Sequence, residues 1–353
     1  MTEPIQITSG SLPSHTTYFL LQSFLPEDRG LMFISYETGA PQIYEISLDS
    51  RERRQLTQSP GIHPFSAAQH PEGEEIVFTR RDSLCAVNRR TLAERTIARC
   101  EGASIGETSI CPDGRWLTAA FRRGDERGIL VAAWDGSEVR TIAFPRMVIH
   151  PQFHPLDTEW IEFAGDPAPR MHRVRRDGTG MECLYQHGND EFVVHETFLG
   201  RTGDLVFTVW PKLLCRMDWT TRRISTIARY NAWHIAPDRA GDRVLCDTNH
   251  PDEGIQIISV ADGSHSLVCR SESSNQGSQW RTSRYALKED FEVAREQGAA
   301  LSWMEADRDT VYGPQGTHPH PSWSRDESKI AFTSDRTGVS QVYVAEIEKR
   351  RHS

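Results

Sequence analysis

The residues best suited to chemistry lie in one stretch, Gln315-Gly-Thr-His318-Pro-His320-Pro321. Two histidines separated by one residue point to the same side of an extended chain, because strand side chains alternate with period two. Imidazole suits first-row divalent metals, and Gln315 adds a third neutral donor. Proline cannot donate to a sheet ladder, so the stretch should begin or edge a strand. It predicts half of a metal site at the rim of a β protein; the alternative is two half-buried histidines beside a turn.

A recurring phrase indicates the elements that would position this stretch. An apolar residue is followed by Pro or a small residue, then Asp, Glu or Gly, then a hydrophobic strand, as expected for a hairpin. Most copies lie roughly 40–45 residues apart, the length of a four-stranded propeller blade. The sequence predicts an all-β fold, a seven-bladed β-propeller forming one domain over residues 1–353. The seven copies begin at Phe24, Gln69, Ile110, Phe153, Phe198, Ile235 and Trp323.

The spacing between the last two copies is about twice the usual one. We interpret the polar segment at about 265–316 as an insertion over one face, with a short helix at 288–298; an eighth blade is the competing interpretation. We expect a strand near residues 4–8 to complete the last blade and close the ring.

Histidines recur just before the repeated phrase, where the first strand of each hairpin would line one mouth of a central channel. A closed ring brings such equivalent positions together, so we expect a spatial cluster. Seven of the fourteen histidines occupy this location: His15, His63, His150, His195, His234, His318 and His320.

Three residues stand out as partners of the His318/His320 pair. His234 could supply a third imidazole, because blades six and seven are neighbours. His195 is a candidate acid or base, because histidine titrates near neutrality. For both, the alternative is a hydrogen-bonded structural histidine. Arg170 lies at the top of a blade-four strand, and the arginines that follow it at 175 and 176 are interpreted as a solvated hairpin.

Bulk composition narrows the class of protein. The chain is 37% hydrophobic and 25% charged, which is ordinary for a globular protein. Its formal net charge of −9 argues against a general nucleic-acid binder. The seven cysteines are scattered without a C-x-x-C pair, which indicates reduced thiols. The N-terminus has no signal-peptide pattern and no run is long enough to span a membrane, so we expect a cytoplasmic protein.

The chain resembles the oligogalacturonate lyase family of seven-bladed propeller polysaccharide lyases. The resemblance is carried by His15-Thr-Thr-Tyr-Phe19, Ile149-His-Pro-Gln-Phe153, His195-Glu-Thr-Phe198, Trp233-His234 and Gln315 to Trp323 with Phe332 to Asp335. It implies a manganese-type ion held by His234, Gln315, His318 and His320, with Ni²⁺ or Zn²⁺ possible in purified protein. It also implies His195 as catalytic base and Arg170 as the carboxylate-binding residue.

The resemblance implies β-elimination on oligogalacturonate or a related uronate oligosaccharide, as in pectin degradation. A cation and an arginine would neutralise the carboxylate, and a base would remove the adjacent C5 proton. The chain departs from the family pattern at Ala164-Gly-Asp-Pro167, where His-Glu-Gly-Pro is usual, and near Gly106, which lacks an aromatic cluster. Two other functions fit the residues: a non-catalytic TolB-like propeller that binds a sugar or a protein, and an epimerase acting on the same C5 centre.

Overall fold

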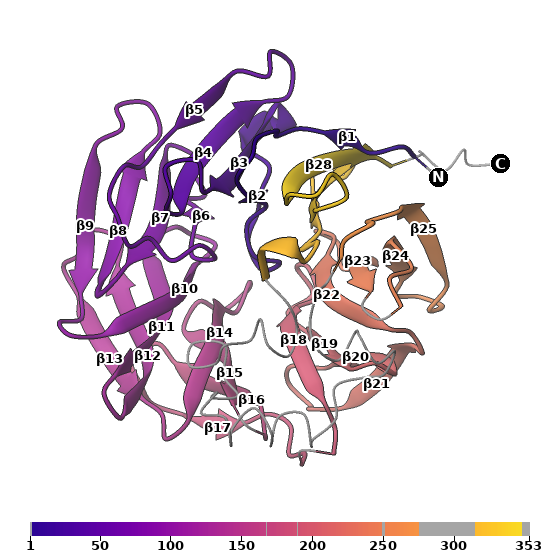
Figure 1. The fold of residues 1–353 in the computed structure, drawn as a ribbon. Helices are drawn as coiled ribbons and strands as arrows, with labels where there is room; N and C mark the ends of the chain where they lie inside the picture. Colours follow the sequence, from indigo (N-terminus) through magenta and orange to yellow (C-terminus); the bar gives the residue numbers. More distant parts are fainter. Residues whose placement is uncertain (1, 167, 189, 249–250, 275–314, 348–353) are drawn as a thin grey trace, which may run out of the picture.

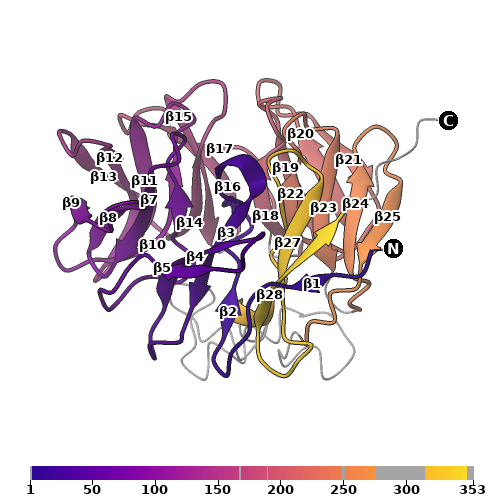
Figure 2. The ribbon, with the colours of Figure 1, turned by 90° about the horizontal axis from the view of Figure 1, so that it is seen from above.

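Seven antiparallel sheets of four strands each form a closed ring in this computed structural model (Figure 1). The structure describes residues 2–166, 168–188, 190–248, 251–274 and 315–347. The strands run between the two faces of the ring (Figure 2). The predicted seven-bladed β-propeller is therefore confirmed.

The first strand of every blade faces the centre of the ring, and the fourth lies at its rim (Figure 1). Blades one to three contain β2 (Ser14–His15), β3 (Gly30–Ser35), β4 (Gln42–Ser47), β5 (Arg53–Gln55), β6 (Ala68–Gln69), β7 (Glu75–Arg80), β8 (Ser83–Asn88), β9 (Glu94–Arg99), β10 (Ser104–Ile110), β11 (Trp116–Arg123), β12 (Glu126–Ala133) and β13 (Val139–Ala143).

The remaining blades follow the same order. Blades four to six contain β14 (Met147–Phe153), β15 (Trp160–Asp166), β16 (Met171–Arg175), β17 (Glu182–Cys183), β18 (Val193–Phe198), β19 (Leu205–Val209), β20 (Leu213–Met217), β21 (Ile224–Ala228), β22 (Ala232–Pro237), β23 (Arg243–Thr248), β24 (Ile255–Ser259) and β25 (His265–Cys269). Blade seven contains β26 (Ser322–Trp323), β27 (Lys329–Ser334), β28 (Gln341–Glu346) and β1 (Ile5–Gln6). Within the described residues, the 3₁₀ helices are η1 (Pro26–Asp28) and η3 (Gln315–Thr317).

The N-terminal strand closes the ring. β1 pairs antiparallel with β28, with Ile5 opposite Val344. The hydroxyl of Thr8 donates to the side-chain oxygen of Gln341 at 2.7 Å, and the Ile7 backbone N–H donates to Val342. This strand is the one expected near residues 4–8, and it joins the two ends of the chain without a covalent link.

The core lies between successive blades. The second strand of six blades buries one phenylalanine completely, and each burial contributes roughly 1.5–3 kcal/mol. In blade six a fully buried Cys246 takes this place, and Asp247 follows it. The six buried phenylalanines are Phe33, Phe78, Phe121, Phe163, Phe207 and Phe332.

Two histidines of the repeated phrase, His70 and His154, link neighbouring blades. They lie on the face of the ring opposite the mouth where the other histidines gather. The ring of His70, in blade two, donates from Nε2 to the carbonyl of Gly114 in blade three at 3.1 Å. His154 of blade four makes the same bond to Gly203 of blade five. Both glycines have positive φ, so these turns favour residues without a Cβ.

The expected insertion begins later than the sequence indicated. His265–Cys269 is not its start but forms β25, because this segment pairs with β24 and completes blade six. Residues 275–314, including the expected helix at 288–298, lie outside the described residues. Among those described, no helix has the length and hydrophobicity needed to cross a bilayer. All seven cysteines are free thiols.

Candidate functional site

The inner strands of several blades are interrupted at a similar height. The pairing register shifts within β10, β14, β18 and β22. At the shift in β14 and β18 lie His150 and His195, with φ of 56° and 54°. A bulge with a left-handed residue bends the strand and re-aims its side chain. These interruptions therefore direct side chains of different blades toward a common region.

Three histidines from blades six and seven meet in this region. Each of His234, His318 and His320 offers a ring nitrogen, and these atoms all lie within 4.8 Å of one another. The three side chains are almost completely buried. His318 and His320 immediately precede β26, while His234 lies on β22, so neighbouring blades supply the set. We refer to these residues as the three-histidine cluster.

Asp247 fixes the orientation of His234. One carboxylate oxygen accepts from His234 Nδ1 and the other from the His234 backbone N–H, each at 2.7 Å. When Asp247 is ionised, this arrangement places the proton on Nδ1 and leaves the Nε2 lone pair available. Metal-binding histidines are commonly held in this way by a carboxylate. Burial raises the pKa of Asp247 to about 7, and backbone hydrogen bonds from His234 and His320 oppose that rise.

His320 has the features of a ligand that lacks its partner. Both ring nitrogens are buried, and neither has a hydrogen-bond partner among the described residues. An unpaired buried polar group is costly, and a metal bond would satisfy one of these atoms. Burial and the neighbouring His234 and His318 hold the pKa of His320 well below its usual range, so the ring is neutral as metal binding requires. The cluster therefore fits a divalent metal ion.

The segment that carries the pair is held by blade one. The hydroxyl of Thr16 lies 3.4 Å from the carbonyl oxygen of Pro319 and 3.3 Å from that of His320. Figure 1 shows the segment after β2 turning toward the middle of the ring beside η3. Gln315, the expected fourth donor, belongs to η3 and so lies three residues before His318. Its role as a ligand stays a prediction.

His195 lies next to the three-histidine cluster but outside it. Its ring centroid is 4.6 Å from that of His234 and 4.5 Å from the indole of Trp233. Burial, together with His234 and His150, holds the pKa of His195 well below its usual range. Its Nδ1 has no hydrogen-bond partner within the part of the chain that the structure describes. His195 is thus a neutral imidazole able to accept a proton.

Arg170 reaches the same region from the segment before β16. Its Nη2 donates to Glu196 at 3.3 Å, and Nη1 lies 3.5 Å from Asp166. Although burial lowers the pKa of Arg170, these two carboxylates raise it overall, so the guanidinium is charged. Its buried Nε has no partner among the described residues and can donate to a bound anion.

Two buried carboxyl groups near Arg170 have pKa values shifted in opposite directions. Burial would raise the pKa of Glu196, but Arg170 and His150 hold it well below its usual range. Burial and the charge of Glu196 raise the pKa of Glu162 well above its usual range. Glu162 accepts one hydrogen bond, from Gln152 at 3.2 Å. Glu196 is therefore ionised at neutral pH, whereas Glu162 keeps its proton to a higher pH than an ordinary glutamate.

The other channel histidines have different surroundings. His150 bonds to Tyr18 and to Glu196. His15 is buried, stacks on Phe65 and has a pKa lowered by burial to about 4. The remaining one, His63, is only half-buried and accepts from the Phe65 backbone.

Asp247 was not singled out from the sequence, and Tyr18 and Glu196 appeared there only within segments that carry the family resemblance, without a role of their own. A signal for Asp247 was present: Leu245-Cys-Asp-Thr248 departs from the Phe-Thr pattern of the same strand in blades two and seven. A carboxylate in a strand that is otherwise buried marks a specialised position. No sequence pattern indicated the hydrogen-bond partners of Tyr18 and Glu196, because those partners lie in other blades.

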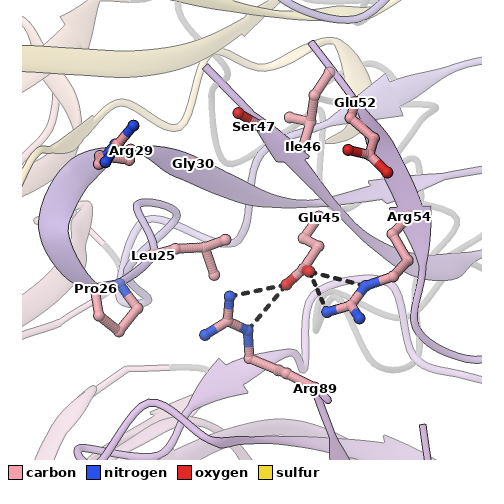
Figure 3. A pocket seen from close by; sticks show the side chains of 10 residues that line it. All are labelled: Leu25, Pro26, Arg29, Gly30, Glu45, Ile46, Ser47, Glu52, Arg54 and Arg89. Carbon is pink, nitrogen blue, oxygen red and sulfur yellow. Dashed lines mark hydrogen bonds and ion pairs between the residues drawn. The ribbon is translucent and has the colours of Figure 1, made fainter. Parts of the chain in front are cut away.

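A separate pocket of about 370 Å³ lies elsewhere on blade one. It includes Gly30 and Ser47, which pair at the first residue of β3. The other end of β3 pairs with β2 and lies beside the histidines. Figure 3 shows Glu45 in this pocket accepting from both Arg54 and Arg89. It contributes no residue to the histidine region.

Two curated proteins resemble the chain along nearly its whole length. An oligogalacturonide lyase of Pectobacterium atrosepticum is 23% identical over 381 residues, which cover 98% of this chain and 93% of that protein. An oligogalacturonate lyase of Dickeya dadantii is 22% identical over 399 residues, with the same coverage. No protein-family model matches the chain. The expected resemblance to the oligogalacturonate lyase family is confirmed by these relatives.

Two solved structures share the fold. An oligogalacturonate lyase in complex with manganese has a TM-score of 0.81 at 18% identity, covering 99% of this chain and 96% of that one. An oligogalacturonate lyase from Vibrio parahaemolyticus has a TM-score of 0.79 at 18% identity, covering 99% and 97%. Both support the seven-bladed architecture over the whole length.

Proposed function

Because the chain is related to oligogalacturonate lyases over nearly its full length, we propose that it is a metal-dependent lyase acting on oligogalacturonate or a related uronate oligosaccharide. The observation that carries the proposal is the three-histidine cluster, with a neutral histidine and a buried arginine beside it. A propeller that only binds a partner has no need for this combination of groups.

The cluster would hold one divalent ion through His234, His318 and His320, with Gln315 as the fourth donor. Mn²⁺ is the proposed ion, since a structural neighbour is an oligogalacturonate lyase in complex with manganese. When bound, such an ion acts as a Lewis acid that withdraws charge from the substrate carboxylate.

Arg170 would bind the same carboxylate. A planar guanidinium matches a carboxylate better than an ammonium group does, and the unpartnered Nε leaves a donor for it. Positive charge beside the carboxylate makes the C5 proton more acidic and stabilises the enolate-like intermediate. Because Glu196 and Asp166 already hold this side chain, it is preorganised for the ligand.

His195 would remove the C5 proton. It is neutral, buried and adjacent to the cluster without belonging to it. The electrons of the C5–H bond then form the C4–C5 double bond as the C4–O bond breaks, and the leaving oxygen takes up a proton. Positioned base catalysis contributes about 10²–10⁴-fold, so charge stabilisation at the carboxylate must supply much of the remainder.

The test is to mix purified protein with oligogalacturonides and Mn²⁺ and to follow the ultraviolet absorbance of the unsaturated product. We expect product formation that stops when a chelator is added. Binding of the oligosaccharide without product would instead support the non-catalytic binding module. Inversion at C5 without cleavage would support the epimerase.

A further inference from the structure

We propose that Tyr18, His150 and Glu196 form a hydrogen-bonded chain that positions the Arg170 guanidinium relative to the three-histidine cluster. The inference concerns positioning residues for the proposed lyase reaction, and its catalytic consequence rests on that proposed function. The geometry of the hydrogen-bonded chain does not depend on that proposed function.

Four side chains from three regions are joined in series. The Tyr18 hydroxyl lies 2.9 Å from His150 Nε2, and His150 Nδ1 lies 3.0 Å from Glu196 Oε1. The same Oε1 accepts from Arg170 Nη2 at 3.3 Å. These residues come from blade one, from β14 and the segment before β16 in blade four, and from β18 in blade five. All four are buried.

The ionised Glu196 carboxylate fixes the direction of two bonds in this chain. An ionised carboxylate only accepts, so His150 donates to Glu196 from Nδ1 and Arg170 donates to the same oxygen. His150 Nε2 is hydrogen-bonded to the Tyr18 hydroxyl, which donates to a neutral ring and accepts from a protonated one. In a buried site such linked bonds strengthen one another, and loss of one leaves the next group unsatisfied.

The other side of Tyr18 faces the three-histidine cluster. Its ring centroid lies 5.2 Å from that of His320 and 6.4 Å from that of His234. Nearby, Thr16 contacts the backbone of the segment that carries His320. The blade-one segment therefore touches the candidate metal ligands with its ring and reaches Arg170 through its hydroxyl. It thereby connects Arg170 with the three-histidine cluster, the two groups that bind the substrate carboxylate in the proposed reaction.

The variant Tyr18→Phe keeps the ring against the cluster and removes only the hydroxyl. We expect it to lower kcat/KM for oligogalacturonides about five- to tenfold, as befits one buried hydrogen bond, and to leave Mn²⁺ affinity unchanged. The control is Tyr44→Phe, a buried tyrosine on β4, which should match wild type. If Tyr18→Phe also matches wild type, the inference is overturned.

A double-mutant cycle shows whether Tyr18 acts through Arg170. In an Arg170→Lys background, which lacks the planar donor fork, Tyr18→Phe should cause less than a twofold further loss. A full five- to tenfold loss in that background would mean an independent role for Tyr18 and would overturn the inference.

A readout without turnover separates this inference from the proposed function. The side-chain NεH signal of Arg170 in an ¹⁵N NMR spectrum, assigned through Arg170→Lys, should shift in Tyr18→Phe and stay in place in Tyr44→Phe. An unmoved signal in both variants overturns the positioning chain, whatever the wild type does with uronates. A signal that shifts in Tyr18→Phe supports the hydrogen-bonded chain. If the same protein cleaves no uronate, only the proposed lyase function fails.

Discussion

The carboxylate of Asp247 decides which nitrogen of His234 is available to a ligand. It accepts from Nδ1 and from the backbone of the same residue, so the ring cannot flip without losing a buried bond. We predict that Asp247→Asn weakens metal affinity about 10–100-fold, because the ring loses its charged partner. Titration calorimetry with Mn²⁺ measures the effect, and the exposed Asp262→Asn of the same blade serves as control. Equal affinities in the two variants would contradict this role.

Glu162 shows how a buried carboxyl links the site to stability. Burial and the charge of Glu196 hold the folded-state pKa of Glu162 well above the ordinary value of 4.5, so between these two pKa values the folded chain keeps a proton that the unfolded chain has lost. The contribution of Glu162 to stability therefore falls as pH rises from about 4.5 toward the folded pKa. We predict that Glu162→Gln is more stable than wild type above pH 4.5, by a margin that widens as the pH rises toward the folded pKa of Glu162.

Thermal or denaturant unfolding across this pH range checks the prediction. The exposed Glu346→Gln serves as the control variant. A constant or narrowing margin for Glu162→Gln would mean that this carboxyl is already ionised in the folded protein.

At the scale of elements, turns of one blade are fastened by the next. A Cβ on Gly114, at φ 74°, would come within 2.7 Å of His70 Nε2, whereas one on Gly102, at φ 73°, would meet nothing within 4 Å. Both replacements carry the same backbone strain, but only the first disturbs the blade contact. We predict that Gly114→Ala lowers the free energy of unfolding by about 1–2 kcal/mol more than Gly102→Ala. Urea denaturation measures it; equal losses would show that the His70 bond is not stabilising.

Elements also explain what the sequence could and could not reveal. The hairpin phrases are local signals, so the blades and the closing strand β1 were predictable. The start of the insertion was misplaced because His265–Cys269 was not recognised as a strand. This segment forms β25, the rim strand that completes blade six. Rim strands carry little hydrophobic pattern, since much of their surface is exposed.

At the scale of the whole molecule, closure of the ring assembles the site. The histidines could be proposed from sequence because repetition puts them at equivalent places. The hydrogen bonds that these histidines make to other blades could not be predicted. Tyr18 is 132 residues from His150 in the sequence, and His150 is 46 residues from Glu196. Such pairs depend on side-chain directions at bulges, and no repeat pattern encodes these. Composition likewise gave no sign that the pKa values of Glu162 and Glu196 would shift in opposite directions.

The central claim is that His195 moves the proton while the three-histidine cluster holds the metal. The most direct measurement compares bound Mn²⁺ and formation of the unsaturated product in wild type, His195→Ala and His318→Ala. We predict that wild type binds the metal and cleaves oligogalacturonides, that His195→Ala keeps metal and ligand binding without product, and that His318→Ala loses both. Near-normal turnover by His195→Ala, or loss of its metal, would contradict the account.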